Sequence, residues 1–260
     1  MNNQSSITAL MSSFGRAFHA ENEDHPVFTD HLAKELMTAE EYTAVQNYIQ
    51  ALKAAVLTGT KQYVILGAGM DTFAFREGEF LAKHQVFEVD HPLTQKDKIE
   101  RITRAGWSVP DNLTFVPVDF TKDNLAERLT ASGFDPSAKS FFSWLGVTYY
   151  LSTEAIDTML AALSELCADG STLVFDYPDE NFFDATEKRV QNTIMMAKAG
   201  GEPMQSAFSY GVLEKLLEKH GFLIYELLTP DDIQRDIIDK AGADLKAFEH
   251  VNYCLAVRKN

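Results

Sequence analysis

Five short apolar segments that alternate with helical patterns constrain the fold of this chain more than any other feature. The apolar segments are residues 62–66, 85–89, 113–118, 140–145 and 172–176, and helical patterns lie between them at about 72–83, 92–105, 122–132 and 153–168. Short apolar runs without alternation are typical of strands that are buried on both faces of a sheet. Strands that alternate with helices form βαβ units, so this order predicts an α/β fold with a doubly wound, Rossmann-like parallel sheet.

Both ends of the chain depart from this alternation. Residues 5–58 are rich in alanine, leucine and glutamate, which predicts a helical cap at residues 1–60 ahead of a main domain at residues 61–260. Near the other end, residues 222–228 and 251–257 have the composition of strands, and only short helical patterns connect them. Two late strands without a long crossover predict an antiparallel pair at one edge of the sheet.

Composition limits the partners of the chain. Its 23 basic and 38 acidic residues give a formal net charge of −15, which disfavours nucleic acid because lysine and arginine supply most of that affinity. No apolar run approaches the roughly 20 residues of a membrane span, and the polar first residues do not resemble a secretory signal. Cys167 and Cys254 lack metal-ligand spacing and the 7 histidines are scattered, so we expect reduced thiols, no metal site and a cytoplasmic location. A small-molecule partner fits these limits best, and the sequence gives no indication of oligomeric state.

The first strand ends at a turn with two glycines. Gly67 and Gly69 stand where the chain leaves the strand and begins a helix, and residues without a side chain let the backbone approach a ligand. Free N–H groups at the start of that helix would attract an anion or a carboxylate. Such a turn also occurs without any ligand, and a dinucleotide-binding fingerprint would have a third glycine where this chain has Thr72.

Acidic residues follow the second and third strands. Asp90 ends the second strand, 19 residues after Asp71, and a carboxylate there can accept both ribose hydroxyls of NAD or of S-adenosylmethionine. Asp119 follows the third strand beside Phe120, and in a nucleoside pocket this pair would meet the amino group and the face of adenine. The alternative for both aspartates is capping of the helix that follows. Ligands of such sheets bind at the carboxyl ends of the strands, so the glycine turn and the two aspartates together predict a nucleoside site there.

The segments that carry these residues also resemble a known family. Residues 62–76, 87–95, 116–120 and 142–151 closely resemble the signature of the leucine carboxyl methyltransferase-like family of class I S-adenosylmethionine-dependent methyltransferases. The resemblance runs from about Arg16 to the C-terminus. It implies a seven-stranded methyltransferase sheet whose last strand is antiparallel, with S-adenosylmethionine as the cofactor.

The resemblance also implies a set of cofactor contacts. The glycine turn would lie along the methionine part of the cofactor, Asp90 at its ribose, and Asp119 with Phe120 at its adenine. Arg16, in the helical cap, would approach the cofactor carboxylate. Members that act on protein phosphatases have a glutamate where this chain has Leu145, which argues against a substrate of that kind. The full implied set is Arg16, Gly67, Ala68, Gly69, Asp71, Asp90, His91, Asp119, Phe120 and Leu145.

The expected reaction is methylation of an oxygen atom, either a carboxylate or a hydroxyl, on a small molecule. A carboxylate acceptor is already anionic and needs no base, whereas a phenol or an alcohol needs a general base. The candidates for that base are Tyr149, Tyr150 and His91, and the alternative for both tyrosines is a structural role in a pocket wall or in the core.

An insertion at about residues 178–208 is expected to cover the acceptor. Its apolar side chains are candidates for the lining of a substrate cavity, and the alternative for them is ordinary core packing. These side chains are Phe182, Phe183, Met195, Met196 and Met204. Two other functions remain open: an NAD-dependent oxidoreductase, which shares the glycine turn and Asp90, and a family member that binds the cofactor without turnover.

Overall fold

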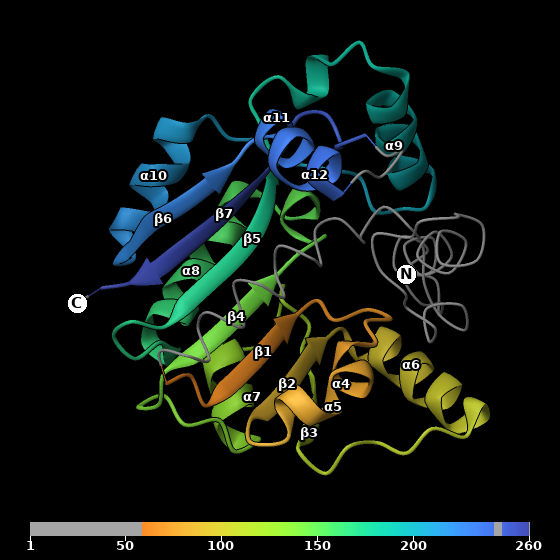
Figure 1. Ribbon diagram of the computed structural model, residues 1–260, viewed down its shortest axis with the longest axis vertical. Coiled ribbons are helices and arrows are strands. Elements are labelled where there is room, and N and C mark those ends of the chain that lie inside the picture. The colour runs from red at the N-terminus through yellow and green to blue at the C-terminus, as the bar shows by residue number, and fades with distance from the viewer. Residues whose placement is uncertain (1–58, 242–245, 260) are drawn as a thin grey trace.

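The computed structural model describes residues 59–241 and 246–259. Residues 1–58 of the expected helical cap, and with them Arg16, lie outside the described residues. Figure 1 shows the described chain from its first strand to its last.

A single seven-stranded sheet organises the described chain, with the strand order β3-β2-β1-β4-β5-β7-β6. The first five strands are parallel to one another, whereas β7 is antiparallel to both β5 and β6. The predicted doubly wound α/β fold with a late antiparallel pair is therefore confirmed, and β7 inserts between β5 and the edge strand β6. The strands are β1 (Gln62–Leu66), β2 (Gln85–Asp90), β3 (Leu113–Pro117), β4 (Ser140–Trp144), β5 (Thr172–Pro178), β6 (Phe222–Leu228) and β7 (Val251–Arg258).

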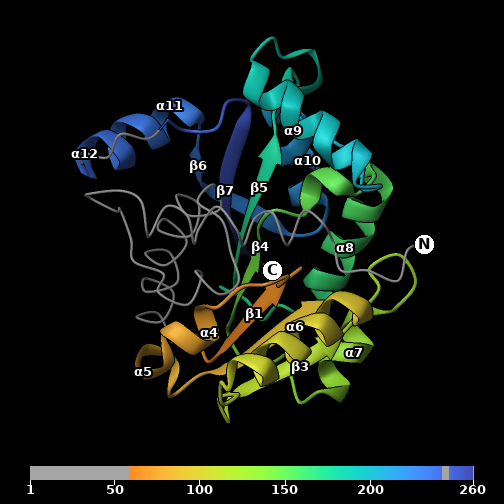
Figure 2. The same ribbon diagram turned by 90° about the vertical axis from the view of Figure 1, so that its right-hand side faces the viewer.

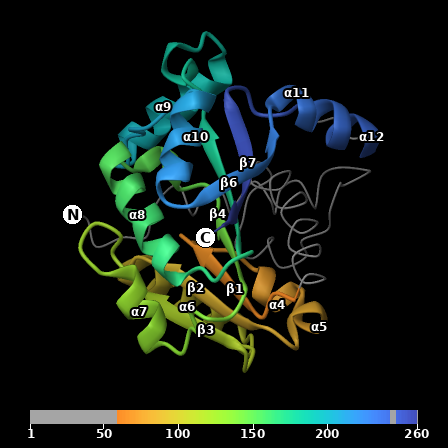
Figure 3. The same ribbon diagram turned by 90° about the vertical axis from the view of Figure 1, so that its left-hand side faces the viewer.

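Helices connect the parallel strands and cover the two faces of the sheet. Figures 2 and 3 show α7, α8 and α10 on one face, with α4, α5, α11 and α12 on the other. The α-helices are α4 (Phe73–Arg76), α5 (Gly78–Leu81), α6 (Pro92–Ala105), α7 (Leu125–Ala131), α8 (Thr153–Leu166), α9 (Lys188–Ala199), α10 (Tyr210–Lys219), α11 (Pro230–Ile233) and α12 (Asp239–Ala241). Helical segments of other types are the 3₁₀ turns η1 (Thr148–Tyr150) and η2 (Phe182–Asp184) and the π-helical η3 (Gln234–Ile238).

Two helices differ from the sequence prediction for identifiable reasons. The single helix expected at 72–83 is two short helices, α4 and α5, which meet at Glu77 and Gly78. Glycine is a poor residue for a helix interior, so a break beside it costs little. Helix α7 begins later than expected because the Asn124 side chain accepts a hydrogen bond from the N–H of Glu127 and caps it there.

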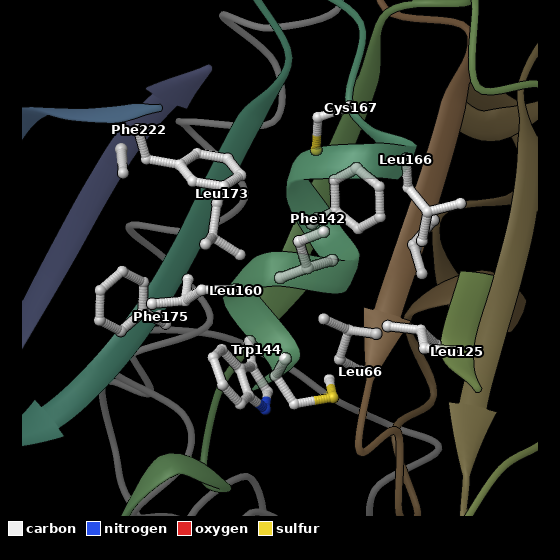
Figure 4. Close-up of a cluster of buried hydrophobic side chains, with 14 of the residues drawn as sticks. Leu66, Leu125, Phe142, Trp144, Leu160, Leu166, Cys167, Leu173, Phe175 and Phe222 are labelled. Carbon is white, nitrogen blue, oxygen red and sulfur yellow. The ribbon is translucent and has the colours of Figure 1, made fainter. Parts of the chain in front are cut away.

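The main core lies between the sheet and helices α7, α8 and α10. Alternate residues of each strand enter it, for example Leu66 from β1, Trp144 from β4 and Phe175 from β5, which lie around Leu160 of α8 (Figure 4). The opposite face carries a smaller cluster in which Tyr63 and Ile65 of β1 pack against α4 and α5. Strands β1, β2, β4 and β5 are buried on both faces, whereas the edge strand β3 is partly exposed. Because these five strands share one direction, their carboxyl ends form a common edge.

Candidate functional site

The glycine turn after β1 is held by hydrogen bonds to β2. The N–H groups of Gly67 and Ala68 donate to the Val89 carbonyl at 2.8 and 3.1 Å, and the N–H of Gly69 donates to Oδ2 of Asp90 at 2.5 Å. The following helix, α4, has only four residues. At its start the N–H of Phe73 donates to Asp71 Oδ1 at 2.6 Å. These N–H groups, which the sequence suggested would attract an anion, are thus satisfied inside the protein.

Gly67 is required by packing as well as by backbone conformation. Its φ is +70°, which disfavours residues with a side chain, and a Cβ at this position would clash with Cγ2 of Val147. Val147 belongs to the segment that follows β4, so this segment lies directly against the glycine turn. The two loops meet at the carboxyl edge between β1 and β4.

Asp90 stands at the end of β2, beneath the glycine turn. Its other oxygen, Oδ1, accepts the N–H of His91 at 2.6 Å. Each carboxylate oxygen has a second lone pair, and the residue is partly exposed, so acceptor capacity remains for a ligand. Burial of the carboxyl group raises the pKa of Asp90, against the lowering effect of the two backbone N–H groups. The alternative of helix capping is wrong for Asp90, because His91 is the N-cap of α6.

A buried ion pair that was not predicted from the sequence lies below Asp90. Glu88 of β2 and Lys98 of α6 are both almost fully buried and form a very short contact. Burial raises the pKa of Glu88 to about 7, even though Lys98 lowers it. The second carboxylate oxygen of Glu88 has no hydrogen-bond partner among residues 59–241 and 246–259. One sequence feature could have indicated this pair: Glu88 lies inside an otherwise apolar strand, and a glutamate is rarely buried unless it is paired.

Asp119 and His91 lie next to each other where β2 and β3 end. Nε2 of His91 is 3.7 Å from Oδ2 of Asp119, and Nδ1 of His91 accepts the N–H of Leu93 at 3.3 Å as a helix cap. Partial burial would raise the pKa of Asp119, but hydrogen bonds from Lys122 and Thr121 lower it to about 2. Asp119 thus organises its own turn, and Phe120 beside it is partly exposed and packs at the margin of the main core.

The segment after β4 is tied to Asp176 of β5. Asp176 is 3% exposed, and its Oδ1 accepts the N–H of Gly146 at 2.9 Å. Its Oδ2 accepts the hydroxyl hydrogen of Tyr149 in a very short bond. Burial raises the pKa of Asp176 to about 6, although these two donors lower it. The sequence placed Asp176 at the end of a strand and gave it no role, because one acid that ends an apolar run has no distinctive spacing.

The other residues of this segment have structural contacts. Tyr150 lies with its ring against that of Tyr149, at 5.4 Å between centroids, and its carbonyl accepts the side-chain amide of Gln205 at 2.6 Å. Leu145 is partly exposed and packs against the smaller core cluster, so it offers an apolar surface at this edge. The structure therefore brings the glycine turn, Asp90, Leu145 and Tyr149 to the same edge of the sheet.

The insertion folds over the end of β5 and β7. Its two ends are joined, because Asp179 pairs with Phe208 in an isolated bridge. Phe182 is buried against Val190 and Val251, and Tyr149 and Met204 pack against this cluster. Three of the side chains that were expected to line a cavity are largely exposed and lie outside this buried cluster, and their place in a cavity stays a prediction: Phe183, Met195 and Met196.

Comparison with known proteins identifies relatives along the whole chain. The sequence pattern of the family described as leucine carboxyl methyltransferase matches residues 47–164. YktD of Bacillus subtilis, a protein named as a candidate S-adenosyl-L-methionine-dependent methyltransferase, is 38% identical to this chain in an alignment that covers 99% of each protein. The confirmed resemblance thus extends beyond the motifs that first indicated it.

Solved structures of low sequence identity have the same fold. The magnesium protoporphyrin IX methyltransferase of Synechocystis PCC 6803, with bound SAH, has a TM-score of 0.56 at 14% identity and covers 98% of this chain and 97% of its own. Human N-acetylserotonin methyltransferase, in complex with SAM, has a TM-score of 0.50 at 15% identity and covers 96% of this chain and 67% of its own.

None of the helices that the structure describes is long and apolar enough to span a membrane.

Proposed function

This chain belongs to the leucine carboxyl methyltransferase family and is an S-adenosylmethionine-dependent methyltransferase, and we propose that it methylates an oxygen atom of a small molecule. The acceptor oxygen belongs to a carboxylate or to a hydroxyl group. A small molecule is favoured over nucleic acid by the net charge of −15, which repels phosphate groups.

We assign the cofactor to the carboxyl edge of the sheet around the glycine turn. In this assignment Gly67, Ala68 and Gly69 lie along the methionine part, and Asp90 accepts the ribose hydroxyls. Asp71 and Leu145 border the methionine end. At the adenine end the assignment includes His91, Asp119 and Phe120, and Arg16 is proposed to approach the cofactor carboxylate.

One observation favours this cofactor over NAD. The pyrophosphate of a dinucleotide is bound by free N–H groups at a helix N-terminus. Here the N–H groups of Gly67 and Ala68 donate hydrogen bonds to the Val89 carbonyl, and that of Gly69 donates to the Asp90 carboxylate. Helix α4 is also too short to supply a strong dipole. A turn of this kind lets the backbone approach the ligand closely and places a carboxylate near a ribose. This arrangement suits a nucleoside without phosphate groups.

The residues at this edge would act mainly by positioning. When bound, S-adenosylmethionine supplies an electrophilic methyl group on a sulfonium sulfur. The protein has to hold an acceptor oxygen in line with that group, at about 3–3.5 Å, and to exclude water. We propose that the helical cap, residues 1–60, and the insertion at 178–208 cover the acceptor, because the buried cluster around Phe182 and Val251 brings the insertion to Tyr149.

The test is transfer of a labelled methyl group from S-adenosylmethionine to small phenols, alcohols, carboxylic acids and amines. Mass spectrometry of the product locates the new methyl group. The proposal predicts a methyl ether or a methyl ester. Methylation at nitrogen or carbon would contradict O-methylation, and cofactor binding without turnover on any acceptor would indicate a family member that has lost catalysis.

A further inference from the structure

A buried carboxylate and a tyrosine hydroxyl face each other at the carboxyl edge between β4 and β5. Tyr149 donates its hydroxyl hydrogen to Oδ2 of Asp176, while the opposite oxygen of Asp176 accepts the N–H of Gly146. A hydroxyl that donates one hydrogen bond retains lone pairs that can accept another. Tyr149 can therefore receive a hydrogen bond from a second hydroxyl group without breaking its bond to Asp176.

This pair lies between the glycine turn and the insertion. Val147, two residues before Tyr149, is in contact with Gly67 of the turn. On its other side the partly exposed ring of Tyr149 packs against the apolar cluster of the insertion. The main chain of Tyr149 is fixed as well, because its carbonyl accepts the N–H of Gln205 at 2.6 Å. Tyr149 thus has a defined position next to both proposed binding regions.

We infer that Tyr149 and Asp176 form a proton relay that removes the proton of a phenol-type hydroxyl acceptor. This inference rests on the proposed O-methylation and narrows its substrate class. As the acceptor O–H proton moves to Oη of Tyr149, the Tyr149 proton moves to Oδ2 of Asp176. The acceptor oxygen then forms its bond to the methyl carbon while the carbon–sulfur bond breaks, with its electron pair left on sulfur. The protonated Asp176 afterwards returns its proton to water.

The charges of the site support a relay of this kind. Burial raises the pKa of Tyr149 well above its ordinary value, and the neighbouring Asp176, Tyr253 and Tyr150 raise it further. A tyrosinate is therefore disfavoured, and both protons have to move together. Burial also raises the pKa of Asp176 to about 6, which leaves it ionised near neutral pH but makes it a better base than an ordinary aspartate.

The same charges select among acceptors. The pKa of a phenol, about 10, lies roughly four units above that of Asp176, whereas an aliphatic hydroxyl is about as weak an acid as water and its pKa lies far higher. A carboxylate acceptor gains nothing from a base and would be repelled by the ionised Asp176. A phenol-type hydroxyl is the acceptor class that matches this site.

The experiment compares three acceptors that share a 4-methoxyphenyl ring: 4-methoxyphenol, 4-methoxybenzyl alcohol and 4-methoxybenzoate. The wild-type protein is expected to transfer methyl groups from S-adenosylmethionine to the phenol alone. Y149F and D176N should lower kcat/KM for the phenol by about 10²–10⁴-fold, the usual contribution of general base catalysis. In wild type, kcat/KM should rise with pH through about 6 as Asp176 ionises, and this rise should disappear in D176N.

Binding measurements separate this inference from the proposed function. S-adenosylhomocysteine should bind wild type, Y149F and D176N equally in calorimetry, and the phenol should bind the Y149F complex about two- to tenfold more weakly because one hydrogen bond is lost. The control is Y210F, since Tyr210 makes a similar hydroxyl-to-carboxylate bond to Glu214 on the surface and should behave as wild type. Failure of wild type to bind S-adenosylhomocysteine would overturn the proposed function. If S-adenosylhomocysteine binds normally, four results would overturn the relay alone. These are transfer to the carboxylate, transfer to the alcohol equal to that to the phenol, no transfer to the phenol, and unchanged kcat/KM in Y149F and D176N.

Discussion

Replacement of Asp90 tests the proposed cofactor site in most detail. In Asp90→Ala the ribose hydroxyls lose a charged acceptor, and hydrogen bonds to a charged group contribute about 1.5–3 kcal/mol. The dissociation constant for S-adenosylmethionine should therefore rise by about 10–150-fold. The N–H groups of Gly69 and His91 lose their acceptor as well, so a further cost of about 1–3 kcal/mol in the free energy of unfolding is expected for each group that stays buried and unpaired.

The Asp90→Asn variant separates these two effects. Its amide oxygen can still accept one of the two backbone N–H groups, so stability should fall less than in Asp90→Ala, while the negative charge at the ribose is lost in both. Cofactor affinity of the wild type should also decline as the pH falls through the raised pKa of Asp90, because the protonated carboxyl is neutral.

The assay is isothermal titration calorimetry with S-adenosylmethionine, alongside urea denaturation of the free protein. Asp111→Asn serves as the control, since Asp111 is an exposed carboxylate in the loop before β3. Unchanged cofactor affinity in a folded Asp90→Ala variant would refute the assignment and leave Asp90 as an anchor for the glycine turn only.

Two further predictions concern the support of this site. Lys98→Met should lower the free energy of unfolding by about 3–5 kcal/mol at pH 8, because it leaves Glu88 buried without its partner. Lys98 lowers the pKa of Glu88, so its removal should raise that pKa above the wild-type value of about 7, against 4.5 in the unfolded chain. The cost should therefore be largest above the folded pKa and should decline as the pH falls towards 4.5, where Glu88 is neutral; an equal loss at pH 5 and pH 8 in urea denaturation would contradict this. Gly67→Ala should cost about 2–4 kcal/mol through its positive φ and the clash with Val147. Val147→Ala in the Gly67→Ala variant should recover only the part of the lost free energy of unfolding that comes from the clash. If a double-mutant cycle shows no coupling energy between positions 67 and 147, this contact is excluded.

Much of the fold could be predicted because a strand that is buried on both faces of a sheet has a short, uninterrupted run of apolar residues. The strand expected at 62–66 and the helix expected at 92–105 agree with β1 and α6 at both ends. The prediction of one helix at 72–83 was wrong, because the spacing of apolar residues does not show how strongly Gly78 interrupts a helix. The position of β7 between β5 and β6 is a matter of strand order, which local patterns do not encode.

The candidate site could be predicted only in part. Asp90 follows an apolar strand next to a glycine turn, so its position at the carboxyl edge could be deduced. Glu88 and Asp176 lie within or at the end of such strands, and their partners Lys98 and Tyr149 come from segments that only the fold brings close. The N–H groups of the glycine turn donate to Val89 and Asp90, and the local sequence does not show these bonds.

The central claim is tested most directly by calorimetric titration of the protein with S-adenosylhomocysteine and, separately, with NAD under the same conditions. The proposed site predicts saturable binding of S-adenosylhomocysteine with one molecule per chain and no detectable binding of NAD. Preferential binding of NAD, or no binding of either S-adenosylhomocysteine or S-adenosylmethionine, would contradict it.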